Sequence, residues 1–373
     1  MAEGDATPPA LSSLMPGEAT GDLPSRSSVY RKVLLGMVTG GIFLLIFAKI
    51  IPELASYEDI WAELKATPPW VVLGLLLIAV VILVLSTAMM VLPIRGIGPW
   101  RAFMTQQGST AISFTIPGPS GTGARFLMLR SYGVDVEDFS RGTVAVSIWN
   151  NVCMLAMPGI AVLLLVAFGK AGDAGSKLLG WGLLAVAVSV GLVAGVAGLV
   201  RSERFARWVG RVGMDVSNWT LRILHKKQVV GWPEAAVTLR TNTVTVLKAR
   251  GGRLTALTLA NYWTNGILLV LCLRMVGIDS TVLPWGVALA TYTVGRLSTV
   301  IQVTPGGVGV VEAAYTAAFV AVTSQSLQPT ILAGVLVYRG FTYLLPIVVG
   351  GFCYLGWRLD RGRGVPVTSS ALA

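Results

Sequence analysis

Apolar residues run in long uninterrupted stretches along this chain, and polar residues fall mainly between them. A bilayer core of about 30 Å needs roughly 20 apolar residues in a helix, and such a helix satisfies its own backbone hydrogen bonds in lipid. The pattern therefore predicts an all-α, polytopic integral membrane protein. Six stretches are long enough to span the membrane, namely residues 33–51, 70–92, 143–168, 178–200, 254–276 and 340–357.

Two further apolar regions are interrupted by proline and glycine, as TIPGPSGTGAR at residues 115–125 and as TPGGVGVVE at residues 304–312. Proline removes a backbone donor and ends a helix, whereas glycine permits tight turns and close backbone approach. We interpret both regions as re-entrant hairpins, and an additional pair of ordinary crossings is the alternative. The expected arms are residues 102–116 and 125–130 in the first hairpin, and residues 284–303 and 312–323 in the second.

With these hairpins, residues 31–200 and residues 254–357 have the same order of two spans, a hairpin and a span, in opposite orientations. Such inverted repeats place broken helices at the bilayer midplane in many transporters. Non-helical backbone at that depth persists only when it is buried in protein or lines a water-filled space. We therefore expect the two turns to form a polar cavity near the midplane.

Composition and charge support a membrane protein and set its topology. Hydrophobic residues make up 54% of the chain and charged residues only 13%, and the formal net charge is +11. Because the basic residues lie between apolar runs, they are expected to face anionic lipid headgroups rather than nucleic acid. The polar segment 201–253 is the most basic part and is predicted to be cytoplasmic. This places the tails, residues 1–30 and 358–373, in the cytoplasm of a protein of the plasma membrane, and the first tail is expected to be disordered.

Within the basic segment, apolar residues recur at three- and four-residue spacing, which is typical of an amphipathic helix. Its arginines fall on the opposite side, so the helix is predicted to bind anionic lipid headgroups at the membrane surface. A plain connecting helix between the two repeats is the alternative. The apolar positions are Phe205, Trp208, Val209, Val212, Val216, Trp219 and Ile223.

Polar and charged side chains near the broken regions are the candidates for a functional site. Glu312 and Arg125 are costly in lipid and are expected to face one another, a polar ligand or water. Half-helix starts expose unpaired N–H groups that suit a phosphodiester. The predicted substrate-binding residues are Gly118, Gly121, Gly123, Arg125, Asn150, Asn151, Arg296, Pro305, Gly306, Gly307, Gly309 and Glu312.

Several charges and amides have more than one interpretation. Arg296 either neutralises Glu312 or contacts a lipid phosphate. Asn261 and Asn265 are expected to form hydrogen bonds between helices, and Arg339 is expected to lie near the outer end of the last span and to extend towards the surface. A headgroup with an amine would explain the acid, whereas an anionic headgroup would explain the arginines.

The run Pro-Gly-Gly-x-Gly-x-x-Glu at residues 305–312, preceded by Arg296, resembles the transmembrane region of lysylphosphatidylglycerol synthases and of related flippase-like proteins. The run Pro-Gly-x-x-Gly-x-x-x-Arg at residues 117–125 resembles the first-half signature of that family. The resemblance covers residues 31–357, but this chain has Thr122 where members often have an acid. It also has Ser147, Trp149, Asn150 and Asn151 in the span where members tend to have an Arg and an Asp. The resemblance implies movement of a lipid between leaflets, without the soluble aminoacyl-transferase domain of the full-length synthases.

We therefore predict a lipid flippase-like transporter that moves a phospholipid or other polar lipid. An enzyme is disfavoured because the sole histidine, His225, lies in the basic segment and no paired carboxylates occur in the apolar runs. No metal or cofactor is expected. The alternative is a non-transporting partner or scaffold of an envelope lipid or glycan assembly machine, acting as a homo-oligomer or beside a membrane enzyme.

Overall fold

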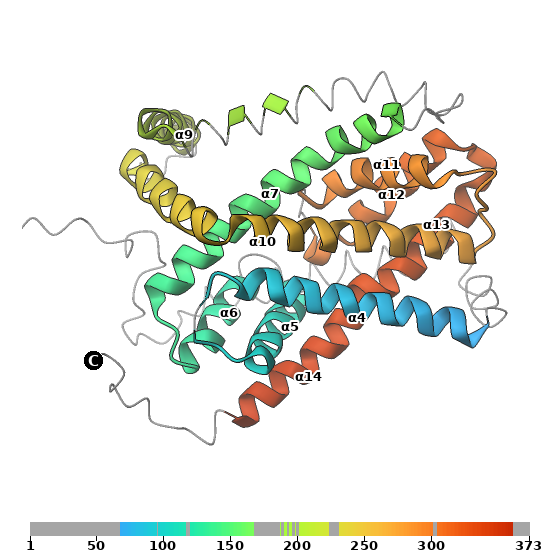
Figure 1. The fold of residues 1–373 in the computed structure, drawn as a ribbon, viewed down its shortest axis with the longest axis horizontal. Coiled ribbons are helices and arrows are strands. Elements are labelled where there is room, and N and C mark those ends of the chain that lie inside the picture. Colours follow the sequence, from blue (N-terminus) through green and yellow to red (C-terminus); the bar gives the residue numbers. More distant parts are fainter. Residues whose placement is uncertain are drawn as a thin grey trace, which may run out of the picture.

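The computed structural model describes residues 68–94, 96–116, 120–167, 187, 190–191, 194–195, 198, 201–223, 231–300 and 304–360. Most of these residues are helical and none lies in a strand, as the apolar pattern predicted. In chain order the helices of the first half are α4 (Pro69–Val91), α5 (Pro99–Thr115), α6 (Ser120–Ser131) and α7 (Val136–Ala167). They are followed by α9 (Glu203–Ile223), α10 (Trp232–Met275), α11 (Trp285–Arg296), α12 (Val310–Val322), α13 (Gln328–Arg339) and α14 (Leu345–Asp360). Figure 1 shows α10 and α14 crossing the body of the molecule.

Five helical segments among the described residues are long and apolar enough to cross a membrane: residues 69–91, 136–161, 232–275, 305–322 and 325–360. On α4 large apolar side chains such as Leu73, Leu77 and Val84 are exposed, as expected for a face that contacts lipid tails. The expected spans at 33–51 and, for most of its length, 178–200 lie outside the described residues. The full count of six spans with two hairpins therefore stays a prediction.

Three helices extend beyond the predicted membrane spans because they continue through polar residues. Helix α7 begins at Val136, seven residues before the expected start of its span at 143, with Glu137 and Asp138 in its first turn, where carboxylates favour the helix dipole. Helix α10 begins at Trp232 and runs without interruption into the span expected to start at 254, because the intervening Gly251 and Gly252 remain helical. The expected last span at 340–357 lies in a longer helical segment, 325–360, in which α13 begins at Gln328.

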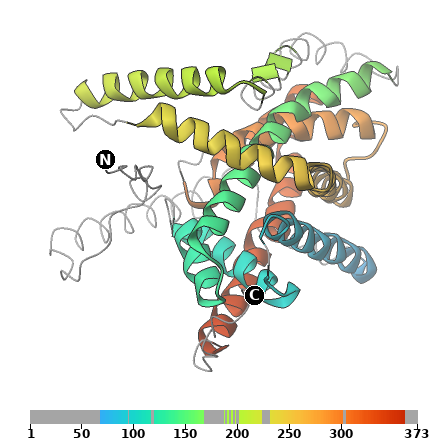
Figure 2. The same cartoon turned by 60° about the vertical axis from the view of Figure 1, so that its left-hand side comes forward.

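The amphipathic segment is helical, as its spacing predicted, and it packs on α10. An added Cβ at Gly210 of α9 would lie 2.8 Å from the Pro233 Cα atom, so this glycine permits close approach of the two helices. Figure 2 shows α9 beside the first part of α10, away from the bundle of α11 to α14.

Four helices, α5, α6, α11 and α12, have 17, 12, 12 and 13 residues, and they pack in pairs. Only together with the preceding 3₁₀ turn does α12 form the candidate span 305–322. Helix α5 packs on α6, and α11 packs on α12. At 1.5 Å per residue, the 12 residues of α11 extend about 18 Å, well below the thickness of a bilayer core. The main core joins the second pair to α4, α10 and α13 through Leu268, Leu269, Tyr315, Phe319 and Val335. The first pair contacts the C-terminal helix α14.

Candidate functional site

The second glycine–proline motif forms a tight turn between α11 and α12. Pro305, Gly306 and Gly307 make one 3₁₀ turn, and Thr304 Oγ1 donates a hydrogen bond to the Val308 carbonyl at 2.8 Å. Gly306, Gly307 and Gly309 have φ values of +60°, +69° and +84°. Residues with a Cβ rarely adopt such values. The run Pro-Gly-Gly-x-Gly is therefore required by the backbone path of the turn.

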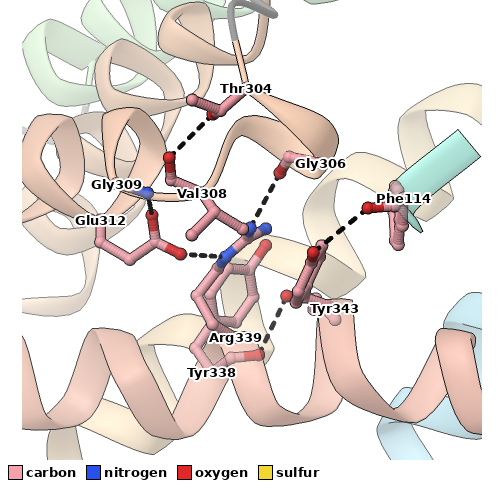
Figure 3. A network of polar contacts seen from close by, with 10 residues as sticks. Phe114, Thr304, Gly306, Val308, Gly309, Glu312, Tyr338, Arg339 and Tyr343 are labelled. Atoms are coloured by element: carbon pink, nitrogen blue, oxygen red, sulfur yellow. Dashed lines mark hydrogen bonds and ion pairs between the residues drawn. The ribbon is translucent and has the colours of Figure 1, made fainter. Parts of the chain in front are cut away.

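Glu312 is held by two different partners in the first turn of α12 (Figure 3). Its Oε2 atom accepts a hydrogen bond from the Gly309 N–H at 2.7 Å, which caps the helix. Its Oε1 atom accepts one from Arg339 Nε at 2.6 Å. The side chains of Glu312 and Arg339 are only 5% and 12% exposed, so this is a buried ion pair.

The placement of Arg339 corrects two predictions. Glu312 pairs with Arg339, and neither Arg125 nor Arg296 forms an ion pair with it among the described residues. The expectation that Arg339 extends to the outer surface was wrong because its helix begins eleven residues earlier, at Gln328, which places Arg339 inside the apolar stretch 325–360. There a guanidinium requires a partner. Besides Glu312, Arg339 binds the Gly306 carbonyl through Nη2 at 2.8 Å.

The helix changes its form directly after Arg339. Gly340–Leu344 is one turn of π-helix, a local widening that occurs frequently at functional sites. The turn places the Tyr343 ring beneath Arg339, whose Cζ atom lies 4.6 Å from the ring centroid. An added Cβ at Gly306 would overlap this ring. The π-helical turn thus fits the side chain of Tyr343 against the glycine turn.

Tyr343 also connects the second motif to the first half of the chain. Its hydroxyl donates to the Phe114 carbonyl at 3.2 Å, and the two rings stack with centroids 5.3 Å apart. Val308 packs in the same small cluster. Phe114 lies at the end of α5, just before the first motif, so the structure brings the regions of both motifs into contact (Figure 3). Residues 117–119, including Gly118, lie outside the described residues.

The described part of the first motif has a different construction. Gly121 begins α6 against α5, where an added Cβ would lie 2.5 Å from the Ser113 Cβ atom and 2.8 Å from the Ser109 carbonyl oxygen. Gly123 faces open space. Arg125, one turn later, donates from Nε to Ser109 Oγ at 3.1 Å and does not face Glu312. Gly121 therefore serves helix packing, and Arg125 has no carboxylate partner among the described residues.

Arg296 ends α11 within a group of tyrosines. Its Cζ atom lies 5.3 Å from the ring centroid of Tyr262. The other members, Tyr292, Tyr315 and Tyr338, come from three successive helices, and all four lie close enough to interact electrostatically with the guanidinium. Tyr315 stacks on Tyr292 and meets Tyr338 edge to face, each pair at 5.9 Å between centroids. We call these four tyrosines with Arg296 the arginine–tyrosine cluster.

The asparagines divide into those that connect helices and one that does not. Asn150 Oδ1 accepts a hydrogen bond from the Tyr262 hydroxyl at 2.9 Å, which connects α7 to the arginine–tyrosine cluster. Asn151 is exposed and donates only to the Ser147 carbonyl of its own helix. The expected interhelical bonds of Asn261 and Asn265 are confirmed, because Asn261 binds the Ile82 carbonyl and Asn265 accepts from Tyr338.

Comparison with known proteins decides the family. The family model described as "Lysylphosphatidylglycerol synthase TM region" matches residues 33–350, which is most of the chain. The chain belongs to this family. It is a membrane protein, as its apolar helices indicate. No curated protein matches the chain.

The sequence analysis did not identify Arg339 or the four tyrosines as residues of the candidate site. Arg339 interrupts an otherwise apolar run from Ile331 to Trp357, and a charge so far from either end signals a buried pair. Tyr292 and Arg296 are four residues apart, the spacing that places side chains on one face of a helix. Tyr315 and Tyr338 carry no such local signal, because only tertiary packing joins them to Arg296.

Proposed function

We propose that this protein moves a phospholipid or another polar lipid between the leaflets of the plasma membrane, as a flippase-like transporter. The observation that carries the proposal is the contact between the two broken-helix regions around the buried Glu312–Arg339 pair. Irregular backbone and charge at membrane depth require protein or water around them and mark substrate paths in transporters. The family's printed description, a region of an enzyme that makes a lipid, supports a lipid as the substrate.

In this proposal α5–α6 and α11–α12 are re-entrant hairpins whose tips line the path of the headgroup. Their lengths and their pairwise packing support this assignment. Helix α9 lies at the cytoplasmic membrane surface, and its exposed Arg204, Arg207 and Arg211 meet anionic headgroups there. Both termini are on the cytoplasmic side, as the basic segment indicates.

Translocation in proteoliposomes tests the proposal. Labelled short-chain phospholipids are incorporated in both leaflets, and a membrane-impermeant quencher reports how fast the inner population reaches the outside. Wild type is expected to accelerate this exchange over empty liposomes, and Glu312→Gln is expected to lose most of the acceleration. Glu137→Gln is the matched control, because Glu137 forms an exposed ion pair with Arg141 at the start of α7.

Wild-type protein that matches empty liposomes for every lipid would contradict transport by the isolated chain. The scaffold alternative would then gain support if the protein co-purified with a membrane-bound lipid or glycan enzyme. Equal losses in Glu312→Gln and Glu137→Gln would show that general damage, and not the buried pair, lowers the rate.

A further inference from the structure

The buried charges of the proposed path are unequal in sign. Glu312 is the only carboxylate in the buried class among the described residues. Arg339 neutralises it. Arg296 and Arg125 have no carboxylate within ion-pair distance in the part of the chain that the structure describes. The protein therefore presents positive charge without a matching negative charge, an arrangement that is costly in a membrane unless an anion compensates it.

The arginine–tyrosine cluster has free hydrogen-bond donors. The hydroxyls of Tyr262 and Tyr338 already donate to the amide oxygens of Asn150 and Asn265. The Tyr292 hydroxyl and Arg296 Nε are buried and have no hydrogen-bond partner among the described residues, although Tyr292 is only 1% exposed. A guanidinium beside an unpartnered phenol offers several N–H and O–H groups, which suit the oxygens of a phosphate.

An amine would find no free buried carboxylate among the described residues. Both oxygens of Glu312 are occupied, one by Arg339 and the other by the Gly309 N–H. A protonated amine near Arg296 would meet like charge in a medium of low dielectric constant, where repulsion is strong. The carboxylate that seemed able to bind a cationic headgroup is therefore part of the protein's own framework.

From these contacts we infer that the arginine–tyrosine cluster binds the phosphate of an anionic lipid headgroup that carries no amine. Arg296 supplies the charge and Tyr292 supplies an additional donor. This inference deepens the proposed function and rests on it for the lipid, although free phosphate would satisfy the same groups. An aminoacylated lipid would instead require an unoccupied acid to bind its amine. The inferred preference for a headgroup without an amine is therefore the opposite of the preference expected for an aminoacylated lipid.

Headgroup preference provides the test. The full chain is reconstituted in phosphatidylcholine vesicles with labelled phosphatidylglycerol, phosphatidylethanolamine or lysylphosphatidylglycerol, and the exchange rates are compared as ratios. Wild type is expected to move phosphatidylglycerol at least tenfold faster than the two amine-bearing lipids. Arg296→Gln is expected to reduce this ratio to near one, and Arg296→Lys, which keeps the charge, to retain most of it. The exposed Arg141→Gln is the matched control and keeps the wild-type ratio.

A binding measurement separates this inference from transport itself. Labelled phosphatidylglycerol is titrated into detergent-solubilised protein, with inorganic phosphate or phosphatidylethanolamine as competitor. Binding that needs Arg296 and resists both competitors supports an anionic lipid headgroup even if no lipid is translocated, in which case only the proposed function fails. Transport that favours amine-bearing lipids overturns the inference and leaves the function standing. Binding of inorganic phosphate with no binding of phosphatidylglycerol overturns the lipid as ligand.

A structural role for Arg296 predicts a different result. If its contacts with the tyrosines only stabilise packing, Arg296→Gln lowers the melting temperature and leaves the ratio of rates unchanged, which overturns the inference. Tyr292→Phe removes a single hydroxyl that has no hydrogen-bond partner among the described residues, so it preserves their packing. It is expected to lower the preference by a few fold, and an unchanged ratio would count against phosphate binding by the cluster.

Discussion

The two glycine–proline motifs look alike in sequence and differ in construction. In the second motif three glycines adopt positive φ values, and the acid that follows is fixed by a backbone N–H and an arginine. In the described part of the first motif, no glycine from 120 to 125 has positive φ, and Gly121 instead permits close packing of α6 on α5. Arg125 there is held by one hydroxyl, that of Ser109.

Glu312 of the second motif is fixed by two partners, whereas the side chain of Arg125 in the first motif has one hydroxyl partner and is more easily displaced. The charge of the Glu312 carboxylate is neutralised by Arg339, so it attracts a cationic ligand only weakly. A guanidinium with a single hydroxyl partner retains most of its five donors. We therefore assign rigidity to the second motif, and we assign to Arg125, as to Arg296, the capacity to bind an anion.

The largest effect on stability is expected from breaking the buried ion pair between Glu312 and Arg339. Glu312→Gln leaves Arg339 buried without a counter-charge, which costs about 3–5 kcal/mol when one partner of a buried pair is removed. Replacing both residues in the double variant Glu312→Gln, Arg339→Gln removes the orphaned charge, so we expect it to be more stable than either single variant. Thermal unfolding in detergent measures all four proteins.

The matching change on the first motif is Arg125→Gln, which removes one hydrogen bond to Ser109 and leaves no buried carboxylate behind. Its cost is expected to be far smaller than that of Glu312→Gln. For the buried pair, additive effects of Glu312→Gln and Arg339→Gln on the free energy of unfolding of the double variant would contradict coupling between the two residues. An Arg125→Gln variant as unstable as Glu312→Gln would show that both motifs are framework.

The second largest effect on stability is expected from replacing a glycine that has a positive φ value. Gly306→Ala forces a Cβ into a residue with a φ of +60°, which costs about 1–2 kcal/mol for an L-residue. The same Cβ would overlap the Tyr343 ring, and such overpacking costs typically 1–3 kcal/mol. The double variant Gly306→Ala, Tyr343→Leu is expected to recover part of the second cost only. A melting temperature of Gly306→Ala equal to that of wild type would show that the turn has another accessible conformation.

The elements that the sequence predicted well are those with a strong local signal. Continuous apolar runs revealed α4 and the apolar parts of α7, α10 and α14, and the three glycines before Glu312 revealed the turn. Helices extend beyond the apolar runs where polar residues continue them, as in α10, because backbone hydrogen bonds persist whether or not the side chains are apolar. Segment polarity reports where a chain meets water, which is a different property from where a helix ends.

The partners of the charged residues could not be predicted because they depend on tertiary contacts. Glu312 and Arg339 are 27 residues apart on different helices, and several arginines in or beside the apolar regions were candidates for one acid. Only the register of α12 against α13 selects among them. The π-helical turn after Arg339 places Tyr343 against the arginine, and no pattern in Gly-Phe-Thr-Tyr-Leu indicates it.

The smallest effects on stability are expected from replacing the two glycines of the first motif, Gly121 and Gly123, with alanine. Gly121→Ala places a Cβ against Ser113 and the Ser109 carbonyl, so α6 must move from α5 at a cost of about 1–3 kcal/mol. Gly123→Ala meets open space two residues later in the same helix. There alanine is expected to be neutral or to stabilise the helix by up to about 1 kcal/mol, since it has the higher helix propensity. Because Arg125 bonds to Ser109, only the first variant should also lower the rate of lipid exchange. Equal melting temperatures and rates for the two variants would contradict a packing role for Gly121.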